Sequence, residues 1–233
     1  MSENYRRIET KSSGPLHVYR PPDHTPDHGV FVFVHGFNHG SRRKWYVDYA
    51  WDEFRLQEKF TESGSQAMLV AVEARQNRSD KIRWSSLPKL TDALQAEGYI
   101  VDGPVHAIGH SAAYVQILKW LDGLTHVTLL DGLYGSVGAY RSYVESGSDA
   151  NIDLFASRGG DPHKNSAKLV SYLDAYHVWQ KLPDLGTHLD TSQVLYAPIS
   201  GVPHMDWVIN SPAITLAAAR AQAIREAKQP PGH

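Results

Sequence analysis

The sequence predicts an α/β protein with a mostly parallel sheet and helices on both faces. Short apolar runs alternate with longer amphipathic runs along nearly the whole chain. Two of the apolar runs, VFVFV at 30–34 and AMLVAV at 67–72, have no polar position, which is typical of strands buried on both faces. Alternation of this kind favours parallel strands joined by helical crossovers, so functional residues are expected in loops at the carboxyl ends of the strands.

The first half of the chain predicts three strands and two helices. The strands are expected at 16–20 (LHVYR), 30–34 and 67–72. Residues 45–62 contain helix formers and no breakers, and residues 85–98 form an amphipathic pattern that Gly98 ends.

The second half continues the alternation. Strands are expected at 105–108 (VHAI), 126–130 (HVTLL), 152–157 (IDLFAS) and 193–198 (QVLYAP). Helices are expected from 111 to about 121, near 139–145, at about 166–181 and at 211–228. Ser211 is the expected N-cap of the last helix, and Pro212 its first helical residue.

Composition narrows the class of protein. The chain has 233 residues, of which 42% are hydrophobic, and a net charge of −2. It predicts one domain over 1–233, with a core at about 16–228 and a frayed tail at 229–233. The charge predicts no nucleic-acid or membrane partner. The absence of cysteine and of an apolar N-terminal segment predicts a cytoplasmic protein.

The stretch Gly109-His110-Ser111-Ala112-Ala113 joins a predicted strand to a predicted helix. This arrangement is the nucleophile-elbow pattern G-x-S-x-G, with Ala113 in place of the last glycine. On such a turn the serine hydroxyl is exposed, and the residues two before and two after it approach closely and must be small. The alternative is a serine that caps a helix after a glycine turn.

Histidines supply the candidate partners. His204 lies in a loop after the last predicted strand, where a general base could reach Ser111. His35 and His39 surround a turn after the strand at 30–34 and could form a metal pair. Their spacing suits two ligands on one face of a helix, but Gly36 and Gly40 disfavour a helix there. No third ligand is evident, so we expect no metal.

Two carboxylates could orient His204. Asp131 directly follows the strand at 126–130, and Asp161 follows the strand at 152–157 in RGGDP. Both give the chain order Ser, Asp, His. Asp161 follows the second strand after the one that leads to Ser111, which is the commoner position for the acid of such a triad. It could also belong to a simple turn. Asp131 is favoured because a charge at the end of a buried strand is costly without a partner, and Asp161 stays the alternative.

Taken together, the segments VHGF, AIGHSAA and PHMDW and the strand-end aspartate resemble the α/β-hydrolase superfamily over residues 16–228. The resemblance implies an eight-stranded, mostly parallel sheet and a Ser-His-acid triad without a cofactor. It also implies that the backbone N–H groups of Phe37 and Ala112 form an oxyanion hole. LLDGLYG resembles a bacterial hydrolase subgroup with Asp-x-Leu-Tyr-Gly in this place, which again favours Asp131.

The expected function is a serine hydrolase that cleaves a carboxylic ester through an acyl-enzyme. Amidase, peptidase or thioesterase chemistry on the same triad, or a non-catalytic binding protein of this fold, are the alternatives. The loops 38–45 and 73–84 are expected to shape an open site. Six aromatic residues are candidates for the site mouth and would suit an apolar or aromatic acyl group: Phe37, Trp45, Tyr46, Trp84, Tyr134 and Trp207. The sequence leaves the substrate and the oligomeric state open.

Overall fold

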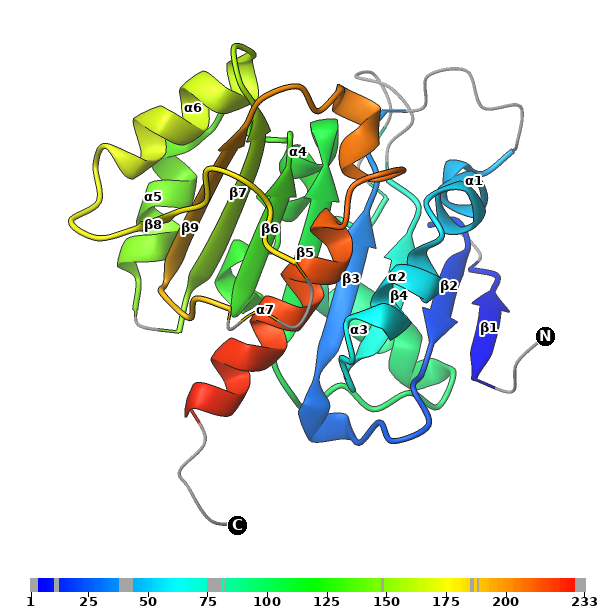
Figure 1. Cartoon of the computed structure of the whole chain (residues 1–233). Coiled ribbons are helices and arrows are strands. Elements are labelled where there is room, and N and C mark those ends of the chain that lie inside the picture. Colours follow the sequence, from blue (N-terminus) through cyan, green and yellow to red (C-terminus); the bar gives the residue numbers. More distant parts are fainter. Residues whose placement is uncertain are drawn as a thin grey trace.

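The structure is a computed structural model that describes residues 4–10, 13–37, 44–74, 81, 83–147, 149–184, 187 and 189–228. One twisted sheet runs through the molecule, with helices on both sides (Figure 1). The tail at 229–233 and most of the loops at 38–45 and 73–84 lie outside the described residues. In the described part of the chain, no helix is both long and apolar enough to cross a membrane.

The described residues form one nine-stranded sheet in the order β1-β2-β4-β3-β5-β6-β7-β9-β8. Strand β2 pairs antiparallel with β1 and β4. The other strands, which follow one another across the sheet as β4, β3, β5, β6, β7, β9 and β8, are parallel. Their bounds are β1 Tyr5–Ile8, β2 Leu16–Tyr19, β3 Val30–Val34, β4 Met68–Val72, β5 Val105–His110, β6 His126–Leu130, β7 Asn151–Ser157, β8 His177–Val178 and β9 Val194–Ile199.

Two hydrophobic clusters fill the spaces between the sheet and its helices. One cluster joins α1, α2 and α7 to one face, and the other joins α3, α4, α5 and α6 to the opposite face. The helix bounds are α1 Tyr46–Glu53, α2 Leu56–Glu62, α3 Leu87–Ala96, α4 Tyr114–Ile117, α5 Val137–Glu145, α6 Asp161–Val170 and α7 Ala213–Lys228. Short 3₁₀ turns add η1 Pro26–His28, η2 Ser111–Ala113, η3 Leu121–Gly123 and η4 His204–Trp207.

The structure confirms the predicted α/β class and corrects the strand count from eight to nine. The sequence pattern missed β1 and β8, which lie at the two edges of the sheet. Edge strands pair on one side only, so their apolar pattern is weak. In β1 only Ile8 is buried, and β8 is two residues long.

The predicted helix at 45–62 is two helices, because Arg55 adopts a left-handed conformation with φ of 50°. Phe54 and Leu56 are both fully buried. Residues two apart point in different directions on a continuous helix. The break at Arg55 therefore allows both side chains to enter the core.

Two other helices differ from their predicted bounds. The helix expected from 111 to about 121 is a 3₁₀ turn followed by the four-residue α4. The helix expected at 166–181 is α6, which begins at Asp161 and ends at Val170. Pro162 fits the first turn of a helix because its missing N–H would have no partner there. Ser211 does accept a hydrogen bond from the Ala213 N–H at 3.2 Å, and α7 begins one residue after Pro212.

Candidate active site

Ser111 lies where β5 turns into the 3₁₀ turn η2, at the carboxyl end of the parallel strands. Its φ is 55°, in the left-handed region that non-glycine residues rarely adopt. A conformation of this kind costs about 1–3 kcal/mol and persists where surrounding structure enforces it. The strand-to-helix turn predicted from the sequence is therefore present, and it includes the backbone strain characteristic of a nucleophile elbow.

Two glycines make room for this turn. A Cβ atom on Gly109 would lie 3.2 Å from the Ala113 Cβ and 2.4 Å from the Ile117 Cδ1. A Cβ atom on Gly36, which follows β3, would lie 2.5 Å from the Ser111 Cβ and 3.1 Å from its Oγ. The backbone after β3 therefore passes directly beside the Ser111 side chain.

Asp131 is buried at the end of β6, and its backbone φ is 46°. Its Oδ1 accepts a hydrogen bond from the Ser157 N–H at 3.0 Å, and its own N–H donates to the Phe155 carbonyl at 2.7 Å. These two contacts with β7 fix the backbone and one carboxylate oxygen. The other oxygen, Oδ2, is directed to His204.

His204 opens the 3₁₀ turn η4 in the loop between β9 and α7. Its Nδ1 lies 2.6 Å from the Asp131 Oδ2, and its side chain is about one-third exposed. A carboxylate only accepts hydrogen bonds, so Nδ1 carries the proton of the neutral ring and Nε2 is the basic nitrogen. This loop, orange near the top of Figure 1, lies at the same end of the sheet as the arrowhead of β5.

His110 makes a hydrogen bond to His204, and the sequence did not predict it as part of the site. Its Nε2 donates to the His204 carbonyl at 3.0 Å, and the two rings are 4.5 Å apart. Burial, together with the neighbouring His204, lowers the pKa of His110 to about 3. The ring is therefore neutral at ordinary pH and acts as a fixed hydrogen-bond donor. Its position directly before Ser111 was the only signal in the sequence.

Tyr134 lies on the solvent side of these residues. It is 42% exposed, and its hydroxyl lies near the Ser111 side chain. Its ring meets the His204 ring edge-on at 6.3 Å. Burial and the nearby Asp131 carboxylate raise the pKa of Tyr134, which keeps the phenol protonated. Tyr134 belongs to the same LLDGLYG segment as Asp131.

Asp161 makes no hydrogen bond or ion pair with His204 in the described structure. It is the first residue of α6, its side chain is 71% exposed, and its carboxylate lies 3.7 Å from the Lys164 Nζ. Asp131, rather than Asp161, therefore makes the hydrogen bond to His204.

The remaining predicted site residues have varied positions. Ala112 directly follows Ser111 in η2, and Phe37 follows Gly36 and is half-buried. His35 is fully buried, where its Nε2 accepts from the Ala74 N–H at 3.2 Å. His39 lies outside the described residues.

Two residues of the predicted aromatic mouth belong to the core instead, since the Trp84 and Trp207 rings fill the space between the sheet and the helices. Tyr46 is also buried, and its ring meets the His35 ring edge-on at 4.5 Å. Tyr134, by contrast, is exposed next to Ser111.

Comparison with known proteins identifies the fold. No family model and no curated protein sequence matches the chain. Solved structures do match. A feruloyl esterase module from Clostridium thermocellum, complexed with sinapinate, has a TM-score of 0.58 at 11% identity, covering 98% of this chain and 90% of that one.

Two further structures extend this similarity. Carboxyl esterase 2 from Tuber melanosporum has a TM-score of 0.54 at 12% identity, covering 97% of this chain and 88% of that one. An acylaminoacyl peptidase from Pyrococcus horikoshii has a TM-score of 0.55 at 14% identity, covering 98% of this chain and 42% of that one. The chain thus has the α/β-hydrolase fold, as the sequence resemblance implied.

Proposed function

We propose that this protein is a serine hydrolase that cleaves carboxylic esters, with Ser111 as nucleophile, His204 as general base and Asp131 as the acid that orients His204. The observation that supports this most strongly is the hydrogen bond of 2.6 Å between Asp131 and His204, beside a serine on a strained strand-to-helix turn. The fold similarity to esterases adds support.

In the proposed reaction, the Ser111 Oγ attacks the ester carbonyl carbon while the His204 Nε2 accepts the hydroxyl proton. Asp131 stabilises the imidazolium that forms. The backbone N–H groups of Phe37 and Ala112 would hold the oxyanion, a contribution of about 3 kcal/mol for each donor. His204 then protonates the departing alkoxide, and the acyl group remains on Ser111.

The second half of the reaction releases the acid. A water molecule attacks the acyl-enzyme while the His204 Nε2 accepts its proton, and the Ser111 oxygen leaves and recovers that proton. The proposed chemistry is complete without a cofactor. The exposed ring of Tyr134 next to Ser111 favours an apolar or aromatic acyl group, and a feruloyl esterase is among the proteins with the same fold.

A fluorophosphonate probe tests the nucleophile. The protein should form a covalent adduct on Ser111, and Ser111→Ala should form none while its unfolding midpoint stays close to that of the wild type. The absence of an adduct on the folded wild-type protein would favour a non-catalytic binding protein.

A matched panel of aryl and alkyl esters, thioesters and anilides then tests the leaving group. Esters should have the highest kcat/KM. A clear preference for anilides would overturn the ester assignment and leave the nucleophile assignment intact.

A further inference from the structure

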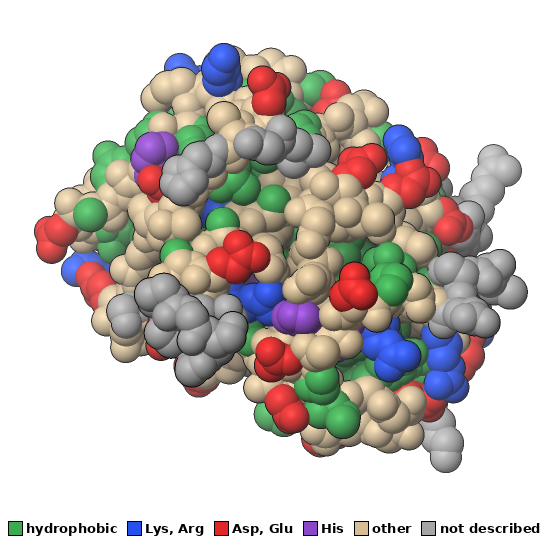
Figure 2. Space-filling model, turned by 60° about the horizontal axis from the view of Figure 1, so that its bottom comes forward, with side chains coloured by type: hydrophobic (Ala, Val, Ile, Leu, Met, Phe, Trp, Pro, Cys, Tyr) green, Lys and Arg blue, Asp and Glu red, His purple; other side chains and the backbone are tan. Residues whose placement is uncertain are grey.

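A cavity lies at the opposite end of the sheet from Ser111, among the first residues of β3, β5, β6 and β7. Its volume is about 400 Å³, and α7 and the turn η1 close its sides. Cavities of about 300–1,000 Å³ are typical of small-molecule sites. Basic, acidic and histidine side chains gather on this lower end of the molecule (Figure 2).

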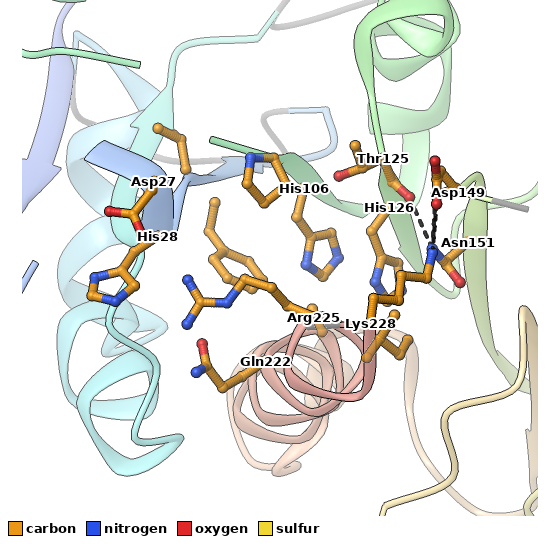
Figure 3. Close-up of a pocket in the computed structure, with 15 residues that line it drawn as sticks. Asp27, His28, His106, Thr125, His126, Asp149, Asn151, Gln222, Arg225 and Lys228 are labelled. Carbon is orange, nitrogen blue, oxygen red and sulfur yellow. Dashed lines mark hydrogen bonds and ion pairs between the residues drawn. The ribbon is translucent and has the colours of Figure 1, made fainter. Parts of the chain in front are cut away.

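One residue of the inner wall of the cavity has a buried polar atom without a partner among the described residues. His106 and His126 project from β5 and β6 toward α7 (Figure 3), and their rings stack at 4.1 Å. The His106 side chain is 3% exposed. Its Nδ1 is buried and has no hydrogen-bond partner among the described residues.

The neighbouring hydrogen bonds fix the proton on His106. Although burial opposes ionisation of Asp153, the charges of Arg220 and His126 lower its pKa, so it is an acceptor. The Thr128 hydroxyl donates to the Asp153 Oδ2 at 3.1 Å and accepts from the His106 Nε2 at 2.9 Å. Burial also lowers the pKa of His106 well below its usual value. The Nδ1 of His106 is therefore a lone-pair acceptor that has no donor among the described residues.

The rim of the cavity offers hydrogen-bond donors, whereas His106 offers an acceptor. The Arg225 side chain extends from α7 across the cavity toward Asp27 and His28 (Figure 3). Its Nε and Nη1 are buried and have no hydrogen-bond partner among the described residues. Of the carboxylates at the rim, Asp149 pairs with Lys228 at 3.0 Å, and Asp27 accepts a hydrogen bond from Thr25. The charge of Arg225 acts on Asp27, but its Nε and Nη1 form no hydrogen bond in the described structure and are donors for an anionic group.

Between these two ends the walls are mainly apolar and suit a flat ring. Phe31, Val30 and Ile224 line the cavity, and the Phe31 ring lies 4.4 Å from the His106 ring. A dry cavity of about 150 Å³ holds benzene, so the space here accommodates one aromatic ring with a substituent at each end.

We propose that this cavity is a binding site, separate from the proposed active site, for a small hydroxyaryl carboxylate. The ligand hydroxyl would donate to the His106 Nδ1, and its carboxylate would accept from the Arg225 guanidinium. The site lies at the amino end of β5, whose carboxyl end carries His110 and Ser111.

Calorimetry with 4-hydroxybenzoate on the full chain tests the proposal, with benzoate and phenol as probes that each lack one polar end. Ser111→Ala is used in parallel so that binding near Ser111 is recognised. We expect saturable 4-hydroxybenzoate binding that Ser111→Ala does not change. Benzoate and phenol should each bind at least about fivefold more weakly, since each loses one hydrogen bond.

Arg225→Gln should raise the dissociation constant about tenfold, because a charge-assisted hydrogen bond is lost. Arg141→Gln removes the charge of an exposed side chain on α5 and should leave the dissociation constant unchanged. Imidazole NMR should report a change at His106 and none at His204. Absence of saturable binding up to about 10 mM, equal affinity in Arg225→Gln, or a change confined to His204 would overturn the proposal. None of these results depends on whether Ser111 is a nucleophile.

Discussion

Replacement of Asp131 by asparagine is the sharpest test of the proposed triad. The Asp131 carboxylate accepts from the His204 Nδ1 at 2.6 Å and from the Ser157 N–H at 3.0 Å. An asparagine has one accepting oxygen and one donating NH₂ group. If the oxygen keeps the Ser157 contact, the NH₂ group faces His204 and favours the tautomer with the proton on Nε2. That tautomer cannot accept the Ser111 proton.

The expected loss is large. The corresponding substitution in a serine protease with a Ser-His-Asp triad lowers kcat about 10⁴-fold, which corresponds to about 5 kcal/mol of transition-state stabilisation. Asp161→Asn is the matched control, since that side chain is 71% exposed and forms an ion pair with Lys164 rather than a contact with His204. Its kcat should stay within about twofold of the wild type.

Both variants should be assayed on an activated aryl ester, with kcat, KM and the urea midpoint measured on the same preparations. A folded Asp131→Asn variant that keeps more than about a tenth of the wild-type kcat would refute the assignment of Asp131. A greater loss in Asp161→Asn than in Asp131→Asn would transfer the acid role to Asp161.

Three further predictions concern packing and burial. Gly36→Ala should lower kcat/KM about 100-fold by displacing the Ser111 side chain, whereas Gly138→Ala, whose Cβ would meet nothing within 4 Å, should not. Asp153→Asn should destabilise the fold by about 3–5 kcal/mol in urea, because its buried arginine partner loses its counter-charge. The free energy of unfolding should fall as the pH drops from 6.5 toward 3, since the unfolded state protonates His110 and the folded state does not; His110→Gln should remove up to about 1.4 kcal/mol per pH unit of this slope.

Each of these has a contradicting result. Wild-type kcat/KM in Gly36→Ala would mean that the backbone after β3 is not close to the nucleophile. An unchanged urea midpoint in Asp153→Asn would mean that the buried ion pair contributes no net stability. An unchanged pH slope in His110→Gln would mean that this histidine titrates alike in both states.

Several elements could be predicted from the sequence because their signals are local. The continuous apolar run VFVFV defines β3 with the predicted bounds, since a strand buried on both faces needs no polar position. The mainly apolar run HVTLL likewise defines β6 with the predicted bounds. The small residues around Ser111 predicted the turn, because only small side chains fit where the strand and the helix approach. The same reasoning placed Asp131 at the end of a buried strand.

The sequence by itself thus determined the α/β class, the central strands and the set of residues worth considering for catalysis. Only the tertiary structure decided which aspartate meets His204, because that depends on where the loop after β9 folds back over the sheet. It also decided the break at Arg55 and the edge strands, which depend on partners distant in the sequence. The cavity beside His106 and Arg225 had no sequence signal, because it forms only where α7 crosses the amino ends of four strands.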